Sequence, residues 1–310
     1  MNIINPIVIT DAMIGAGTTI AEPSATETAW SGAAVAYAVG DIRIRATTHR
    51  KYKCAVAHTS AASPLPESDP TRWADMAPTD RYAPFDIYTS TAAATVTSLT
   101  YVLTPGYFNA LALYGLTGGQ YSVTEKDATG GTNIFTRTGF LTEDPVDWYE
   151  YLFVAPKAKK SLVFTGLPIR PAAELTITIT AATGAAVGVG MIVPGDFAPL
   201  FGDGKFGGTL HGASAEPFTY SYIKTYEDGT TKIVKRLSAT NLRLSVVMPR
   251  EEADGVLQVL QGVLDVPVAC IATTAPGYAG LTTFGLISTA PVKYDSFNVG
   301  TLEISVKGIV

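Results

Sequence analysis

The sequence predicts a mainly β chain composed of a small β module, a β-sandwich, and a C-terminal α+β unit with one main helix at about 249–264. Charged residues make up only 16% of the 310 positions, and β-branched residues are plentiful, as strands prefer. Short alternating stretches recur between turn residues. A single longer stretch carries apolar residues at helical spacing.

Residues 1–29 are predicted to form an extended N-terminal arm. Ile3–Ile4 and Ile7–Ile9 are strand-like, and a turn is expected around Pro23. Two alternatives remain open for this arm. It either adds a strand to the chain's own sheet or docks on a neighbouring subunit.

Residues 30–84 are predicted to form the small β module, bracketed by Trp30 and Trp73. After a turn at Gly40–Asp41, residues 42–45 alternate between apolar and basic side chains, which is the period of a half-buried strand. A second strand is expected at 51–56, and the loop at 47–50 suits a hairpin.

This order of aromatic, turn and strand residues resembles the small chitin-binding type of carbohydrate-binding module, over about a fifth of the chain. The resemblance implies glycan or partner contacts through five aromatic side chains: Trp30, Tyr37, Tyr52, Trp73 and Tyr82. Such modules stack sugars on exposed aromatics after the second strand, where this chain has Val56, Ala57 and His58 instead. The alternative is that the large aromatics form the core of a tiny domain.

Residues 85–207 are predicted to form a two-sheet β-sandwich. Strands are expected at 95–103, 108–114, 120–125, 133–136, 148–153, 161–164, 174–180 and 187–193. This pattern resembles a galactose-binding-type jelly roll, a fold that carries no function by itself. The glycine-rich stretch at 201–212 has neither a P-loop nor a dinucleotide-binding pattern, so we expect a turn or domain junction there.

Residues 208–310 are predicted to form the α+β unit. A hairpin is expected at 218–237, and strands at 242–248, 266–271, 281–287 and 298–306. Pro249 suits the first helical position, and Glu251 and Glu252 suit the N-terminal dipole of the helix. Six residues form its apolar stripe: Ala253, Val256, Leu257, Leu260, Val263 and Leu264.

Composition and motifs exclude several function classes. The net charge of −5 and the lack of a basic block argue against nucleic-acid binding. Cys54 and Cys270 are predicted to be buried free thiols, and the isolated histidines do not suit a metal site. The sequence contains no secretory signal pattern and no apolar run long enough to span a membrane.

Catalysis is also not predicted, because the sequence shows no nucleophile motif. Its carboxylate pairs, Glu143/Asp144, Glu251/Glu252 and Asp75/Asp80, have no spacing that indicates an active site. We therefore expect a protein that is not an enzyme, with no catalytic residue, no cofactor and no metal.

The segment at 72–86 and the C-terminal unit resemble structural proteins of tailed-phage virions. This resemblance implies a non-enzymatic component of the phage tail, in the tail tip, baseplate or fibre-attachment region, that assembles in the host cytoplasm. Its implied partners are other tail proteins and further copies of the chain in a homo-oligomer. The alternative is binding of a host-surface glycan or receptor through the small module or the sandwich.

Overall fold

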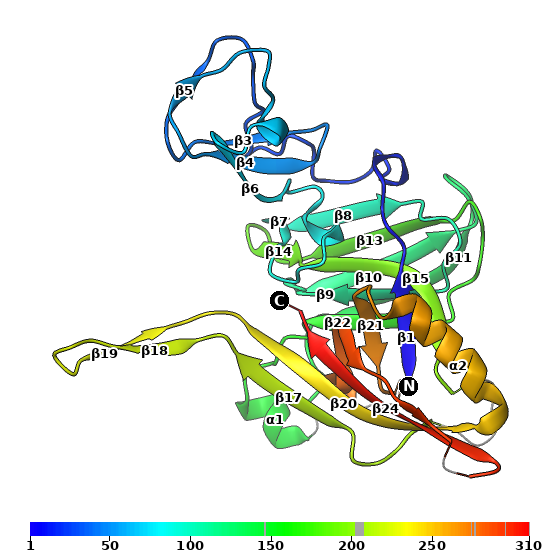
Figure 1. Cartoon of the computed structure of the whole chain (residues 1–310). Coiled ribbons are helices and arrows are strands. Elements are labelled where there is room, and N and C mark those ends of the chain that lie inside the picture. Colours follow the sequence, from blue (N-terminus) through cyan, green and yellow to red (C-terminus); the bar gives the residue numbers. More distant parts are fainter. Residues whose placement is uncertain (146, 202–207, 274, 276, 295, 310) are drawn as a thin grey trace.

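The computed structural model describes residues 1–145, 147–201, 208–273, 275, 277–294 and 296–309 (Figure 1). It confirms the prediction of a mainly β chain with one main helix. The largest sheet in the described residues has eleven strands, and smaller sheets pack against it or extend from it. Figure 1 shows the small module at one end of the molecule and the C-terminal unit at the other.

The N-terminal segment begins with an inner strand of the large sheet. Strand β1 (Asn2–Pro6) pairs antiparallel with β15 (Met191–Pro199) on one side and with β21 (Val268–Ile271) on the other. The sequence left open whether this segment adds a strand to the chain's own sheet or docks on a neighbouring subunit. In the structure, residues 2–6 form a strand of the chain's own sheet. A 3₁₀ turn (η1, Asp11–Met13) follows.

The small module is held by two short sheets. Strands β3, β4 and β6 form one sheet, and β2 pairs with β5 in the other. Two 3₁₀ turns, η2 (Pro66–Ser68) and η3 (Ala83–Phe85), lie before and after β6. The strand bounds are β2 (Ala36–Tyr37), β3 (Ile42–Arg45), β4 (Arg50–Cys54), β5 (His58–Thr59) and β6 (Trp73–Pro78).

The predicted sandwich is present. The sheet β11-β10-β13-β8 packs its apolar face onto β12-β9-β15, and residues of both sheets share one core cluster. A short pair, β7 (Ala93–Val96) with β14 (Ala186–Val189), lies beside them. The other bounds are β8 (Ser98–Leu103), β9 (Ala110–Tyr114), β10 (Gln120–Lys126), β11 (Asn133–Phe140), β12 (Ser161–Thr165) and β13 (Glu174–Thr180).

The C-terminal unit continues the same large sheet. From β1 the strand order runs β21-β22-β24-β20-β16, with β17 also paired to β20 and β23 to β24. The bounds are β16 (Gly208–Thr209), β17 (Ser214–Thr219), β18 (Tyr222–Thr225), β19 (Thr231–Val234), β20 (Ser238–Pro249), β22 (Thr282–Thr289), β23 (Val292–Lys293) and β24 (Val299–Gly308), with the 3₁₀ turn η4 (Ala279–Leu281) before β22.

Helix α2 (Arg250–Val263) packs on β20 and β24, one residue inside each predicted bound. Four residues of its predicted stripe are buried: Ala253, Val256, Leu260 and Val263. Leu257 and Leu264 stay more than one-third exposed, so the buried stripe is narrower than the sequence suggested.

The strand predicted at 148–153 is wrong. Residues 148–153, expected as an aromatic strand, form the short helix α1 (Trp148–Phe153). The side chain of Asp147 accepts a hydrogen bond of 2.7 Å from the backbone N–H of Glu150, which caps the first turn. Aspartate followed three residues later by glutamate is a helix-start pattern, and here it outweighs the strand propensity of the aromatics.

Of the turn or junction predicted at 201–212, residues 202–207 lie outside the described residues, and Gly208–Thr209 form the short strand β16. On either side of that stretch, the two units share a single sheet through β1. Strand β9 is buried along its whole length, because the sandwich core covers one face and a separate cluster containing Ile4 and Phe284 covers the other.

Candidate interaction surfaces

The aromatic residues between β2 and β6 form the core of the small module. Tyr37 and Trp73 meet edge-to-face with ring centroids 5.1 Å apart, and His58 meets Trp73 at 5.4 Å and 90°. Tyr52 and Cys54 complete the buried cluster. Alternation along β4 turns both of these side chains inward, which is why a module with so few residues can bury a core at all.

The five predicted contact residues differ in how far their side chains are buried. Tyr37, Tyr52, Trp73 and Tyr82 are each no more than 8% exposed. Trp30 is partly buried against the module core, and the guanidinium of Arg45 lies 5.1 Å from its ring centroid. A sugar stacks on a ring face that is open to water, so these four buried side chains lack the open face that a platform needs. Tyr37, Tyr52 and Trp73 belong to the module core.

The loop after β4 corresponds to the place where the resemblance to carbohydrate-binding modules would put stacking residues. Here Val56 is exposed, and Nδ1 of His58 lies 2.8 Å from the carbonyl oxygen of Val56. The ring of His58 packs against the rings of Tyr37 and Trp73. This loop therefore presents an aliphatic side chain where an aromatic pair would be needed.

Tyr82 lies apart from the module core, in a contact between the module and the N-terminal segment. Its ring stacks on His49, with centroids 3.8 Å apart, and its hydroxyl donates a hydrogen bond of 2.7 Å to Asp11. Nδ1 of His49 lies 2.8 Å from the carboxylate of Glu22, which also accepts a hydrogen bond from Thr79. Burial, followed by the hydrogen bond to Asp11, raises the pKa of Tyr82.

A second polar group reinforces the same contact. The ammonium of Lys51 on β4 pairs with the carboxylates of Asp80 and Glu27, and Glu27 also accepts backbone hydrogen bonds from Ser24 and Asp80. Burial works to raise the pKa of Asp80, but hydrogen bonds from Lys51, Ser24 and Thr26 hold it below its usual range. These ion pairs fix the module against residues 22–27.

The carboxylate pairs singled out in the sequence do not converge. Asp75 pairs with Arg50 whereas Asp80 pairs with Lys51, and Asp144 is almost fully exposed near Lys159. Among the described residues, no group of three or more His, Cys, Asp or Glu side chains could hold a metal ion. In the same part of the chain, no helix is long and apolar enough to cross a membrane.

One carboxyl group lies inside the sandwich core. Glu125 shares its strand face with Val123, is fully buried, and has no hydrogen-bond partner on either oxygen within the described structure. Burial raises its pKa to about 7, and the charge of Arg170 opposes this only in part. Its position makes it a determinant of stability.

Helix α1 exposes several large apolar side chains close together in the sequence. Five of its six side chains are between 63% and 78% exposed: Trp148, Tyr149, Tyr151, Leu152 and Phe153. Contiguous exposed apolar groups of this kind mark interaction sites in soluble proteins. Sequence reasoning missed this surface because the aromatic run at 148–153 was expected to form a strand of the sandwich.

The second apolar surface is the hairpin arm, which we define as residues 220–237. Strands β18 and β19 pair with each other and extend away from the body (Figure 1). Six large apolar side chains along it are at least 42% exposed: Tyr220, Tyr222, Ile223, Tyr226, Ile233 and Leu237. A two-stranded hairpin is only marginally stable alone in water, and β18 and β19 pair only with each other among the described strands.

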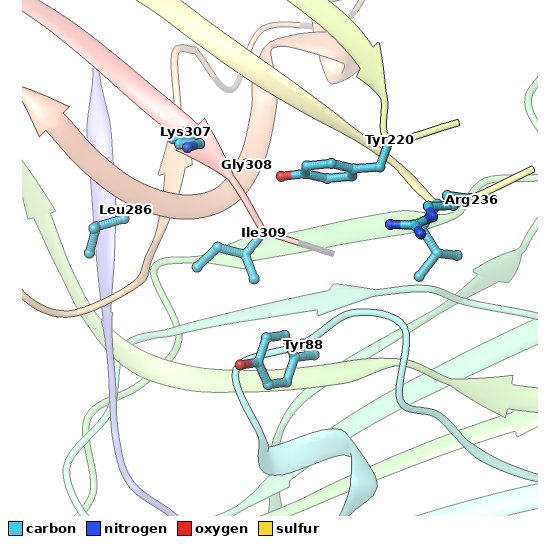
Figure 2. Close-up of a pocket in the computed structure, with 8 residues that line it drawn as sticks. Tyr88, Tyr220, Arg236, Leu286, Lys307, Gly308 and Ile309 are labelled. Carbon is cyan, nitrogen blue, oxygen red and sulfur yellow. The ribbon is translucent and has the colours of Figure 1, made fainter. Parts of the chain in front are cut away.

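The base groove is a cavity of about 600 Å³ where the arm leaves the body. Figure 2 shows Tyr220 and Tyr88 facing the groove from opposite sides, with Ile309 between them and Arg236 at one end. Leu237, Leu286, Lys307 and Gly308 complete its lining. Among the described residues, its lining thus combines apolar and aromatic groups with two cations.

Comparisons with protein-family models, with curated proteins and with solved structures each found no match.

Proposed function

We propose that this protein is a non-enzymatic structural component of a phage tail, joined in the virion to other tail proteins and to further copies of itself. The single observation that carries the proposal is the hairpin arm. Its apolar side chains have no covering surface in the part of the chain described, so burial on another subunit would stabilise it.

The exposed helix α1 supports the same proposal. It lies on the connection between β11 and β12, in a different part of the sequence from the arm, and five of its side chains are exposed and apolar. Two contact surfaces allow a subunit to bind a copy of itself with one and a different tail protein with the other. The resemblance of segment 72–86 and of the C-terminal unit to tailed-phage structural proteins points to a virion tail as the place of assembly.

The glycan-binding alternative has less support from the geometry. Four of the five aromatic side chains on which it depended are buried, and the loop at Val56 has no exposed aromatic pair. Receptor binding through the small module would therefore need a surface other than those rings.

The experiment measures the mass of the purified protein by light scattering over a range of concentrations. We expect oligomers for the unchanged chain and a shift towards monomer for Ile223→Thr combined with Ile233→Thr. These residues are paired in register on the arm and are each 65% exposed, and threonine keeps strand propensity. Val96→Thr, at a 59% exposed strand position outside the arm, is the matched control.

The second part of the test uses virions. A protein that remains monomeric at every concentration and is absent from purified particles would contradict the proposal. Turnover of a cell-wall or capsule polymer, abolished by changing a single Asp or Glu, would contradict its non-enzymatic part.

A further inference from the structure

The outer face of the sandwich sheet β11-β10-β13-β8 carries an ordered array of hydroxyl groups (Figure 1). The strand register places one residue of each strand in a row across the sheet. Every member of the central row has a hydroxyl group: Thr138, Ser122, Thr178 and Thr100. Because neighbouring strands lie about 4.8 Å apart, hydroxyl groups recur across the sheet at that spacing.

Alternation along the strands places this array on the side of the sheet away from the core. Val123, Ile177 and Tyr101 form the row one residue further along, and all three are buried in the sandwich core. Two more rows therefore share the outer face, namely Thr136, Thr124, Thr176 and Val102 on one side and Phe140, Gln120, Thr180 and Ser98 on the other. None of the residues in these three rows carries a charge.

A hollow of about 230 Å³ lies on this face, where the hydroxyl array meets Phe140. Phe140 is the last residue of β11, and its side chain is 64% exposed. From the outer rows, one aromatic ring, one amide and four hydroxyl groups line the hollow: Phe140, Gln120, Ser122, Thr138, Thr178 and Thr180. Tyr121 and Gly139 complete a lining that contains no charged side chain among the described residues.

The polar side chains of the hollow are almost unused inside the protein. The hydroxyl groups of Thr178 and Thr100 share a hydrogen bond of 3.2 Å. In the part of the chain that the structure describes, the other hydroxyl groups of the lining and the amide of Gln120 form no intramolecular hydrogen bond. Each hydroxyl and the amide can both donate and accept, so the hollow suits a ligand with several donors and acceptors of its own.

The composition of the hollow distinguishes among ligand classes. An ion would find no opposite charge in the lining, and a wholly apolar ligand would leave the hydroxyl groups without partners. A neutral saccharide meets both conditions, because its hydroxyl groups pair with the array and the apolar C–H face of its ring stacks on Phe140. The volume is below the roughly 300–1,000 Å³ of pockets for drug-sized ligands, so the hollow suits a single sugar ring.

We propose that the outer face of this sheet binds a neutral saccharide, with one sugar ring against Phe140 in the hollow and further units along the central row of hydroxyl groups. The site is separate from the buried rings of the small module. It also goes beyond the proposed structural role, because it requires neither the hairpin arm nor self-association.

Titration calorimetry with neutral oligosaccharides tests the site. The probes are maltohexaose, cellohexaose and N-acetylchitohexaose, and an oligomer of polygalacturonic acid serves as the charged comparison. We expect at least one neutral probe to bind with a dissociation constant of about 1 mM or below. The charged oligomer should bind more weakly, because the lining offers no cation to its carboxylates.

Substitutions in the lining identify the contacts. Phe140→Leu keeps an apolar side chain but removes the ring face, so it should raise the dissociation constant at least about fivefold. Phe140→Tyr keeps the ring and should stay within about twofold. Thr138→Val removes one hydroxyl group at nearly constant shape and should raise the dissociation constant about three- to tenfold.

Matched controls carry the same substitutions elsewhere on the surface. Phe297→Leu changes an 84% exposed phenylalanine, and Thr231→Val changes an exposed strand threonine on β19. Both positions lie outside the lining of the hollow, so both variants should bind the probe within about twofold of the unchanged chain.

Four outcomes would overturn the inference. They are no binding of any neutral probe at about 1 mM, tighter binding of the charged oligomer, and full binding by Phe140→Leu. The fourth is a change of mass without a change of saccharide affinity in Phe140→Leu and Thr138→Val, which would make this face a contact between copies. Ile223→Thr combined with Ile233→Thr should bind the probe normally, so failure of the saccharide site and failure of the proposed assembly are distinguishable.

Discussion

The ring of His49 lies flat against the ring of Tyr82, with centroids 3.8 Å apart and 20° between their planes. His49 sits at the turn between β3 and β4 with a positive φ of 52°, so the backbone is held in an uncommon conformation to make this contact. The pair joins the small module to the N-terminal segment through Glu22 and Asp11. The module is therefore attached by a specific contact and not by a free linker.

The first prediction concerns Tyr82. Tyr82→Ala should lower the free energy of unfolding by about 3 kcal/mol through the cavity it leaves. Tyr82→Phe should cost about 1 kcal/mol, because it removes the hydroxyl that donates to Asp11. Denaturant titration checks both values. Loss of binding on a glycan array with unchanged stability would show instead that Tyr82 is a recognition residue.

The second prediction concerns Lys51. Lys51→Met should destabilise the protein by about 1–3 kcal/mol, because the largely buried carboxylate of Glu27 loses its cation. Lys53→Met, at an exposed position on the same strand, should have little effect and serves as the control. A second change, Glu27→Gln in the Lys51→Met background, should recover part of the loss. Equal effects at Lys51 and Lys53 would contradict the role of the ion pairs.

The third prediction follows from the lowered pKa of Asp80. A carboxyl whose pKa is lower in the folded state contributes stability that is complete above the unfolded-state pKa of about 4. That contribution is lost as the pH falls through the folded-state pKa. Unfolding measured between pH 6 and pH 2 should therefore show a steeper acid loss for the unchanged chain than for Asp80→Asn.

The fourth prediction concerns Glu125, whose pKa is shifted in the opposite direction. The folded state keeps the proton up to about pH 7 whereas the unfolded state releases it near 4.5. Between these values the folded state binds more protons, so stability should fall as the pH rises from about 4.5 to about 7 and then level off. Glu125→Gln should flatten this dependence, while exposed Glu216→Gln should leave it unchanged.

A rise in stability over that pH range for the unchanged protein would contradict the assignment. So would a pH dependence that Glu125→Gln leaves intact.

The fifth prediction concerns β1. Ile4 is fully buried in the cluster shared by β9, β15 and β21, so Ile4→Ala should cost about 2–5 kcal/mol. Because β1 pairs with strands of both units, the sandwich and the C-terminal unit should still unfold in one transition. Val8→Ala, at an 82% exposed position, is the control. Two separated calorimetric transitions would show that the shared sheet does not couple the units.

Local patterns predicted much of this architecture. The strands at 42–45 and 174–180 and the helical spacing of Ala253, Val256 and Leu260 are predicted correctly, because each depends on neighbours along the chain. At 42–45, only Ile44 of the two isoleucines is buried. The sequence could not show that residues 2–6 would lie between β15 and β21, since strand pairing between residues so far apart leaves no local signal.

The candidate surfaces were harder to predict for a related reason. The aromatics of the small module could be core or platform, and burial alone separates the two. The run at 148–153 has the composition of a buried strand but forms an exposed helix, because Asp147 and Glu150 start a helix and nothing in the chain covers it. The base groove joins Tyr88 to Arg236 and Lys307, a grouping that only the tertiary fold creates.

The central position of β1 also constrains how the chain reaches its native state. Asn2 pairs with Pro199 and Ile271. Both partners are synthesised long after Asn2, so β1 cannot pair until most of the chain has been made. Until then, β1 has no strand to pair with, so its backbone N–H and C=O groups lack a sheet partner. Pairing over such a long separation in sequence is slow, so this apolar strand stays exposed during part of synthesis.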